Sequence, residues 1–360
     1  MIPATRKQKN DSAPDTVPEW QRELGRAIRD TGELQSTLGL PEDTAGDAGF
    51  PVRVPRGYVA RMRPGDPCDP LLAQVLPSAA ETRDIPGYGP DPVGDRAAMI
   101  RPGVLHKYHG RVLLIATGAC GIHCRYCFRR EFPYADANPR PDDWQAALEY
   151  IAADETIEEV ILSGGDPLSL PDSKLSHLVK RLEAIPHIGT LRIHTRLPVV
   201  LPERVDDRFH RWLSGTRFAT VVVLHANHGN EIDASVDSAV QRLRSTGAMV
   251  LNQAVLLRGV NANEDAMVDL SRRLFAAGVL PYYLHMLDPV RGAARFEIGS
   301  EEACRLMAAV AARLPGYLVP RLVMEEPGRP GKTPLAHDWS GCRDGVTTPT
   351  VDEAGGPATP

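Results

Sequence analysis

The sequence contains no long apolar run. None of its 360 residues lies in a stretch that approaches the roughly 18 consecutive apolar residues of a membrane-spanning helix. The first residues, MIPATRKQKNDSAPD, also lack the apolar core of about 7 to 15 residues that a signal peptide needs. These two absences predict a cytoplasmic protein with no membrane partner.

The chain also has no excess of positive charge, and cysteine is scarce. Its 41 lysine and arginine residues face 46 aspartate and glutamate residues, a net charge of −5, so no general positive field would attract nucleic acid. We therefore expect small molecules or proteins as partners, and no nucleic acid. Three of the six cysteines crowd between residues 120 and 127, which fits a metal or redox site in a reducing compartment better than a disulfide framework.

The two ends of the chain are poor in residues that could form a core. Residues 1–18 are polar, and residues 341–360 are rich in Gly, Pro and Thr, so both are predicted to be disordered tails. EWQRELGRAIRDTGELQSTLGL, residues 19–40, has helical spacing and a stop at Gly39, and DPLLAQVLPSA, residues 69–79, predicts a further short helix. We expect residues 19–100 to form an N-terminal helical region.

From Arg111 onward, short β-branched runs alternate with helical patterns. Such alternation predicts an α/β fold with right-handed βαβ units and a parallel sheet, either an open doubly wound sheet or a barrel. The predicted strands are 111–117, 159–164, 190–195, 219–225, 248–255 and 281–287, and the predicted helices are 142–153, 172–185, 203–214, 233–247 and 263–278. Distinctive polar residues follow the strand ends, which is where both kinds of α/β fold keep their sites.

The loop GACGIHCRYCFRRE, residues 118–131, contains the pattern C-x3-C-x2-C. Thiolates at this spacing suit zinc or an iron–sulfur cluster, but structural zinc needs four ligands, and His123 lies too close to Cys124 to serve as the fourth. The other cysteines, Cys68, Cys304 and Cys342, stand alone in the sequence. Three cysteines on a cubane cluster leave one iron open to a further molecule, which favours the cluster.

Two glycine-containing motifs carry weaker signals. SGGDPL, residues 163–168, follows the second predicted strand and is either an ordinary turn or a ligand-binding loop. EEPGRPGKTPL, residues 325–335, resembles a phosphate-binding P-loop, but the first required glycine falls at Glu326 and Pro334 disfavours the helix that should follow. Lys332 is therefore either a solvated surface charge or a lysine that holds a planar cofactor as an imine, with Gly328 and Gly331 permitting close backbone approach.

The loop CGIHCRYC, placed after the first strand of a six-unit βα pattern, resembles that of the radical S-adenosylmethionine (SAM) enzymes. The resemblance extends from about Trp20 to Leu335 and is strongest to the lysine 2,3-aminomutases, which also carry pyridoxal 5′-phosphate (PLP). It is carried further by PGVLHKYHGRVLL, HCRYCFRR, LNQAVLLRGVN and LPYYLHMLDPVRGAARF. Among the aminomutases, the short bacterial members that serve elongation factor P are the most similar.

This resemblance implies a fold and three cofactors. Residues 101–290 would form a partial (β/α)6 barrel, and residues 291–340 a C-terminal segment that carries the PLP lysine. A 4Fe–4S cluster would sit on Cys120, Cys124 and Cys127, and Lys332 would bind PLP as an aldimine. The other implied PLP contacts are Lys107, Arg111, Asn252, Gln253 and Arg258. The implied SAM contacts are Ser163, Gly164, Gly165, Asp166, His225, Asn227 and His228.

The resemblance also implies the substrate and the reaction. Arg129 would pair with the carboxylate of L-lysine, and Asp288 and Glu325 would meet its distal ammonium. The product would be β-lysine, attached by a separate ligase to elongation factor P, and a flavodoxin or ferredoxin would supply electrons. Two departures stand out: the metal-binding cysteines of the longer members have only Cys342 as a counterpart, and Glu325 replaces an aspartate, as in the short members. A free-standing amino-acid aminomutase and a non-catalytic iron–sulfur electron carrier remain alternatives.

Overall fold

The structure is a computed structural model that describes residues 17–42, 49–137 and 144–336. The two predicted tails, Cys342 and the start of the helix predicted at 142–153 fall outside these residues, apart from residues 17 and 18. Within them, no helix has the length and apolarity that crossing a membrane requires.

The N-terminal region is less regular than its sequence predicts. Residues 19–40 form two helices, α1 (Glu19–Gly25) and α2 (Thr31–Leu38), because the backbone of Ile28 pairs with Val54 and interrupts the helix. Asp30 caps α2 and Gly39 ends it in the left-handed conformation, as expected. The short helix predicted at 69–79 is only a 3-10 turn, η2 (Leu72–Gln74).

A single ten-stranded sheet follows, and its strands lie in the order of the sequence. The six predicted strands are present as β3 (Arg111–Thr117), β4 (Glu159–Gly164), β5 (Thr190–Thr195), β6 (Ala219–His225), β7 (Met249–Val255) and β8 (Leu280–His285), all parallel. A seventh parallel strand, β9 (Arg321–Met324), pairs with β8. The open, barrel-like α/β fold is therefore confirmed, and the sheet is not closed.

Like β9, three further strands were not predicted from the sequence, and they extend the sheet at its two edges. β1 (Met99–Arg101) and β2 (Val104–Tyr108) add antiparallel to β3, and β10 (Thr333–Pro334) adds antiparallel to β9. β10 is two residues long and forms a hairpin with β9, so that Glu325 and Lys332 face each other across the turn. Gly328 lies in this turn with φ of 80°, and a Cβ on it or on Gly331 would meet nothing within 4 Å. The positive φ of Gly328 shapes the turn, and with open space beside both glycines their role in close approach to a cofactor stays a prediction.

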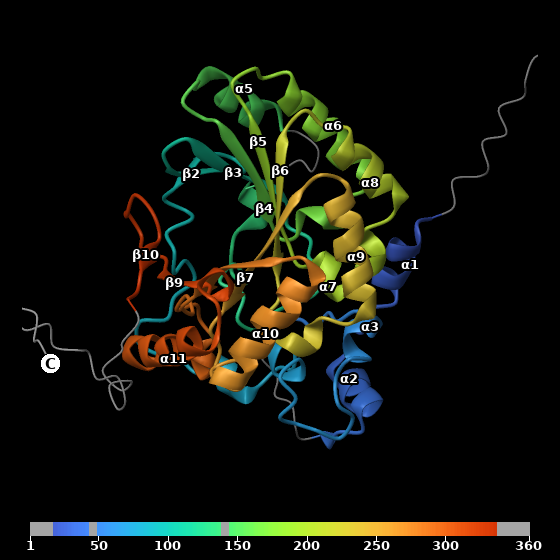
Figure 1. Ribbon diagram of the computed structural model, residues 1–360, viewed down its shortest axis with the longest axis vertical. Helices are drawn as coiled ribbons and strands as arrows, with labels where there is room; N and C mark the ends of the chain where they lie inside the picture. The colour runs from blue at the N-terminus through green and yellow to red at the C-terminus, as the bar shows by residue number, and fades with distance from the viewer. Residues whose placement is uncertain (1–16, 43–48, 138–143, 337–360) are drawn as a thin grey trace, which may run out of the picture.

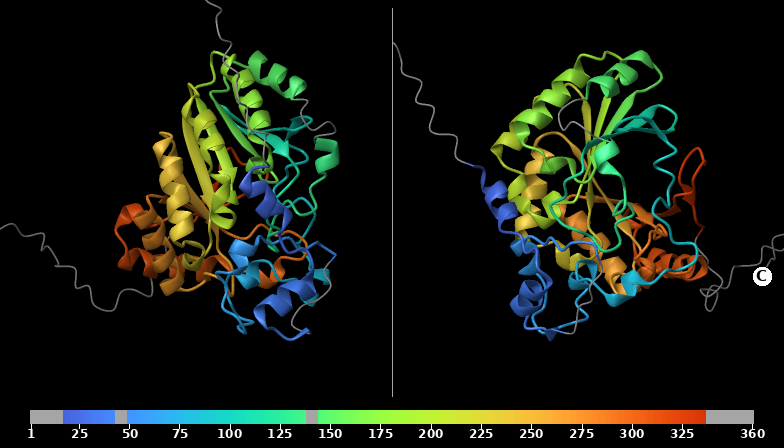
Figure 2. Two further views of the ribbon diagram at one scale, coloured as in Figure 1. Left: turned by 90° about the vertical axis from the view of Figure 1, so that its right-hand side faces the viewer. Right: turned by 180° about the vertical axis from the view of Figure 1, so that it is seen from behind.

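The connecting helices cover the outer face of the sheet (Figure 1). They are α5 (Gln145–Ala153), α6 (Asp172–Glu183), α8 (Asp207–Ser214), α9 (Ala234–Ser245), α10 (Glu264–Ala277) and α11 (Ser300–Arg313), with short turns α3 (Arg56–Val59), α4 (Tyr134–Ala137) and α7 (Leu197–Val200) between other elements. Short 3-10 turns complete the list: η3 (Ala79–Thr82), η4 (Pro167–Ser169), η5 (Pro202–Arg204), η6 (Gly229–Glu231), η7 (Ala294–Phe296) and η8 (Gly316–Leu318). Of the N-terminal helices, drawn in blue, α2 lies toward the lower end of the molecule in each view, and α1 lies near mid-height (Figure 2).

Each parallel strand divides its residues between two faces. Leu191 and Ile193 of β5 are fully buried beneath the helices, whereas Arg192 and His194 point to the opposite, inner face. Because side chains alternate along a strand, the buried apolar set fixes which polar side chains share the inner face.

Candidate functional site

A cavity of about 500 Å³ lies against the inner face of the sheet. It is lined by the cysteine loop at one side and by the β9–β10 hairpin at another, with inner-face residues of β3 to β8 as its wall. Most of the site residues that the sequence predicted line it: Lys107, Arg111, Cys120, Cys124, Cys127, Arg129, Ser163, Gly164, Gly165, Asp166, His225, Gln253, Asp288, Glu325 and Lys332. Residues more than 200 positions apart in the chain thus share one space.

The three clustered cysteines all line this cavity and form no disulfide. Burial, then the neighbouring thiols, raise the pKa of Cys127 to about 11 and that of Cys120 well above its usual range. Among the described residues, no three His, Cys, Asp or Glu side chains converge tightly enough for one metal ion. Three separate sulfurs that need positive charge to ionise fit a cluster in which each thiolate binds a different iron.

The Gly-Gly-Asp motif packs directly on this loop. A Cβ on Gly165 would lie 2.4 Å from the carbonyl oxygen of Ala119, so only glycine fits. Asp166 is fully engaged by the protein: its carboxylate accepts hydrogen bonds from the Thr195 hydroxyl at 2.7 Å and from the Arg196 backbone N–H at 2.7 Å. Its side chain thus ties the end of β4 to the end of β5, and Gly164 and Gly165 line the cavity.

A chain of alternating charges runs from Arg129 toward the hairpin. The Arg129 guanidinium donates to Asp95 at 2.8 Å and to the Ser163 hydroxyl at 3.1 Å. Asp95 also pairs with Lys107 at 2.6 Å. Burial would raise the pKa of Asp95, but the adjacent Arg129 and Lys107 cations outweigh it and hold the pKa below its usual value. Asp95 therefore stays ionised and holds both cations in place.

This series of charged side chains ends at the β9–β10 hairpin, where the Lys332 ammonium donates a hydrogen bond to the Glu325 carboxylate at 2.5 Å. The other oxygen of Glu325 accepts a hydrogen bond from the Tyr108 hydroxyl at 2.6 Å. Lys107 lies 3.5 Å from the same carboxylate. Burial opposes ionisation, but the Lys332 cation prevails and lowers the pKa of Glu325. The Arg111 guanidinium stacks over Tyr108 at 4.7 Å and has no acidic partner among the described residues.

Asp288 is the unpaired carboxylate of the site. No described residue donates a hydrogen bond to its side chain. Burial, reinforced by Glu325 and opposed by Lys332, raises its pKa to about 7. An ionised, unpaired carboxylate is costly to bury, so this side chain is suited to receive a cationic group of a ligand.

Three histidines at the ends of β5, β6 and β8 complete the wall: His194, His225 and His285. Burial lowers the pKa of His194 and of His225 to about 3, and that of His285 well below its usual value. The His225 Nε2 atom lies 2.9 Å from the Tyr126 hydroxyl, while the His194 Nε2 atom is buried with no hydrogen-bond partner among the described residues. All three are neutral near pH 7 and add hydrogen-bonding groups without charge.

Four predicted contacts do not line the cavity. Asn252 hydrogen-bonds the backbone of Ala226, and Asn227 bonds the side chains of Gln74 and Tyr126. The His228 Nδ1 atom accepts from the Asn230 backbone. Arg258 is exposed and pairs with Glu302 at 3.1 Å. The asparagines hold the β6 loop in shape, whereas direct ligand contacts by these four residues stay predictions.

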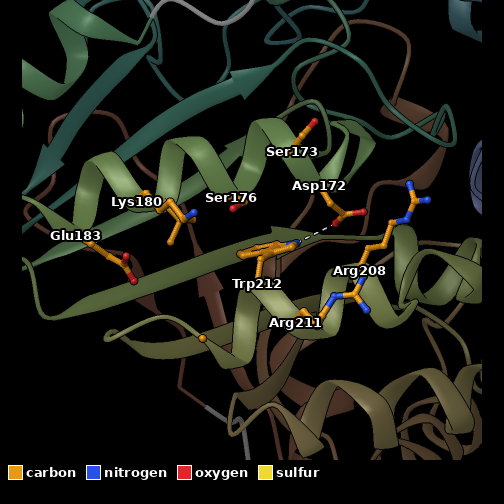
Figure 3. A pocket seen from close by; sticks show the side chains of 10 residues that line it. Asp172, Ser173, Ser176, Lys180, Glu183, Arg208, Arg211 and Trp212 are labelled. Atoms are coloured by element: carbon orange, nitrogen blue, oxygen red, sulfur yellow. Dashed lines mark hydrogen bonds between the residues drawn. The ribbon is translucent and has the colours of Figure 1, made fainter. Parts of the chain in front are cut away.

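A second cavity, of about 420 Å³, lies on the outer surface between α6 and α8 (Figure 3). There the Trp212 indole N–H donates to Asp172 at 2.8 Å, and Lys180 and Glu183 flank the opening. It contains no cysteine and none of the predicted site residues. The inner cavity is therefore the candidate site.

The fold and the site define a class of protein. An open parallel α/β sheet holds three clustered cysteines and a glycine motif at the ends of its first two parallel strands. In agreement, residues 114–270 match the radical SAM superfamily.

Within that superfamily, the chain belongs to the L-lysine 2,3-aminomutase family. It is 45% identical over 323 residues to the L-lysine 2,3-aminomutase of Escherichia coli, covering 88% of this chain and 94% of that protein. It is 47% identical over 320 residues to the Haemophilus influenzae protein of the same name, and the match covers 87% of this chain and 94% of that protein. Identity to that of Clostridium subterminale is 32% over 328 residues, covering 89% of this chain but 78% of the relative. Enzymes of this family are radical SAM isomerases that use a 4Fe–4S cluster, SAM and PLP.

Sequence reasoning missed several residues of the site. Asp95 lies in a loop, GYGPDPVGDRAAM, without a recognisable motif, and Tyr108 lies in a strand that was not predicted. Arg196 follows β5 directly, and its place at a strand end is the one signal that could have singled it out.

Proposed function

We propose that this protein is a lysine 2,3-aminomutase that converts L-α-lysine into β-lysine by an intramolecular transfer of the amino group. One observation carries the proposal: three clustered cysteines and Lys332 line the same cavity, together with Arg129, Asp288 and Glu325. Such a site suits a substrate with one carboxylate and two amino groups. When bound, the cofactors would supply the radical and the electron-delocalising ring of this chemistry.

The residues of the cavity fit the three cofactors. Cys120, Cys124 and Cys127 would hold the 4Fe–4S cluster, and the tightly packed turn of Gly164 and Gly165 beside them would hold SAM. Lys332 would hold PLP. Arg111, which has no acidic partner among the described residues, and Lys107 are the cations available for its phosphate, with Gln253 on the wall.

Glu325 would accept the proton that the Lys332 ammonium loses. The lysine nitrogen must lose its proton before it can bond to a carbonyl carbon, and the Glu325 oxygen at 2.5 Å is the nearest acceptor. Tyr108 and Lys107 keep that carboxylate anionic through a hydrogen bond and charge. The same carboxylate would return the proton to Lys332 and hold its ammonium group when the lysine is released.

The remaining polar groups would orient the substrate. Two of the Arg129 N–H groups are occupied by Asp95 and Ser163, and the rest of its five can form a fork with the substrate carboxylate. Asp288, which has no partner among the described residues, would receive the distal ammonium. The apolar wall and the neutral histidines would exclude water and stray charge around a reactive radical.

The test is an anaerobic assay of reconstituted protein. With L-lysine, SAM and a low-potential reductant, chiral chromatography should detect β-lysine. Formation of deoxyadenosine without β-lysine, or rearrangement only of amino acids with neutral side chains, would contradict the proposed substrate.

We further propose that β-lysine is passed to a ligase that attaches it to elongation factor P, in the cytoplasm, with a flavodoxin or ferredoxin as electron donor. Glu325, which stands where the longer members have an aspartate, supports this subtype. Deletion of the gene should remove the β-lysyl mass increment from elongation factor P, and added β-lysine should restore it. An unchanged mass would favour a free-standing aminomutase.

A further inference from the structure

Cys124 differs from the other two clustered cysteines in its contact with a cation. Its Sγ atom accepts a hydrogen bond from the Arg196 Nη1 atom at 2.7 Å, and the same nitrogen donates to the Tyr126 hydroxyl at 2.6 Å. Arg196 is only 6% exposed. Among the described residues, no cationic side chain donates to Cys120 or Cys127. The Arg196 charge is therefore in direct contact with one sulfur of the three, whereas Arg53 acts on Cys120, and Arg129 on Cys127, only through space.

The guanidinium is held in this orientation from its other side. Its Nη2 atom donates to Gln74 at 2.7 Å, to Glu231 at 2.9 Å and to the Tyr58 hydroxyl at 3.2 Å. Glu231 is fully buried, and its charge lies beyond the guanidinium as seen from the sulfur. The pair is therefore a buried dipole whose positive end faces Cys124.

We propose that Arg196 is a positioning residue that fixes Cys124 and raises the reduction potential of the cluster. The inference rests on the proposed 4Fe–4S site. One-electron reduction by a low-potential donor adds one negative charge to the cluster and neither forms nor breaks a bond. A cation in contact with a ligand sulfur stabilises that charge, because hydrogen bonds to the sulfurs and local charge set cluster potentials. Glu231 acts in the opposite sense but from farther away.

The test compares cluster potentials in Arg196→Gln and wild type. Both proteins are reconstituted anaerobically with iron and sulfide and titrated with dithionite in the presence of redox dyes, with the reduced cluster followed by electron paramagnetic resonance. For Arg196→Gln we expect the ratio of reduced to oxidised cluster at a fixed potential to fall about tenfold, or about 59 mV for a one-electron couple. Arg196→Lys, which retains the charge, should recover part of this shift.

The Glu231→Gln variant distinguishes an electrostatic effect of Arg196 on the cluster potential from a purely structural one. Removing the distant anion leaves the arginine uncompensated, so the potential should rise. Arg192→Gln is the matched control, since this arginine lies on β5, which Arg196 follows directly, but pairs with Glu159 at 2.5 Å and donates to none of the three cysteines; the cluster potential of this variant should match wild type.

The outcomes separate the inference from the proposed function. A wild-type protein that takes up no cluster would overturn both. A cluster-bearing wild type whose potential is unchanged in Arg196→Gln, or shifts in the same direction in Arg196→Gln and Glu231→Gln, would overturn the inference alone. If Arg196→Gln binds no cluster, the Glu231→Gln variant decides the question. A cluster potential in Glu231→Gln equal to or below that of wild type would then overturn the inference.

Discussion

Neutralising Asp288 should stabilise the cofactor-free protein and weaken substrate binding. Partial burial raises the pKa of this carboxyl from 3.8 to about 7, which at 1.36 kcal/mol for each pKa unit corresponds to at most roughly 4 kcal/mol. Because the folded state binds this proton more tightly than the unfolded chain, stability falls as pH rises from about 4 to about 7 and stays low above that. The anion has no described partner to offset its burial.

We therefore expect Asp288→Asn to raise the free energy of unfolding by up to roughly 4 kcal/mol at pH 8, and by less than half as much at pH 5. Urea unfolding of the cofactor-free protein at the two pH values measures both. In the loaded enzyme, the variant should bind lysine at least about a hundredfold more weakly, because breaking a buried ion pair costs about 3–5 kcal/mol. Wild-type affinity should also fall as pH drops below about 7.

Two results would refute this reasoning. Equal stability of variant and wild type at pH 8 would show that the carboxylate is not buried without a partner. Unchanged lysine affinity would show that Asp288 does not meet the substrate ammonium, even if the fold and cofactors stand.

Three further predictions concern the other parts of the site. Cys124→Ala should abolish stable cluster binding, measured as iron and sulfide content, whereas Cys304→Ala should retain both; a full iron complement in Cys124→Ala would contradict the ligand assignment. Borohydride reduction followed by peptide mass spectrometry should find the pyridoxyl group on Lys332, and Lys332→Ala should lose the tag but keep its cluster. Asp95→Asn should lower the free energy of unfolding by about 3–5 kcal/mol, since it leaves Arg129 and a neighbouring lysine without their shared carboxylate, and an unchanged urea midpoint would argue against that role.

The parallel strands were predictable because their local signals agree with the tertiary fold. β4, β5 and β6 begin and end where the sequence predicted, since each is a short β-branched run between turn or capping residues. The long amphipathic helix α10 was equally clear, from Asn263 at its start to Gly278 at its end.

The structural elements that the sequence did not predict depend on partners far away along the chain. The break between α1 and α2 exists because Ile28 pairs with Val54, which no pattern within residues 19–40 reveals. β10 contains only Thr333 and Pro334, too short for any periodic signal, and forms because β9 is beside it. Chain-distant pairing overrides local propensity in each case.

By itself, the sequence determined which chemical groups are available: three closely spaced thiols, a glycine motif, and a lysine in a Gly/Pro-rich loop. Their spacing along the chain is enough, because a loop of eight residues must bring its own sulfurs together. Only the tertiary structure decided what surrounds them. It brought Asp95 between Arg129 and Lys107, placed Arg196 against Cys124, and left Asp288 without a partner among the described residues. These contacts join segments far apart in sequence, and their charges act through space at distances that no local pattern encodes.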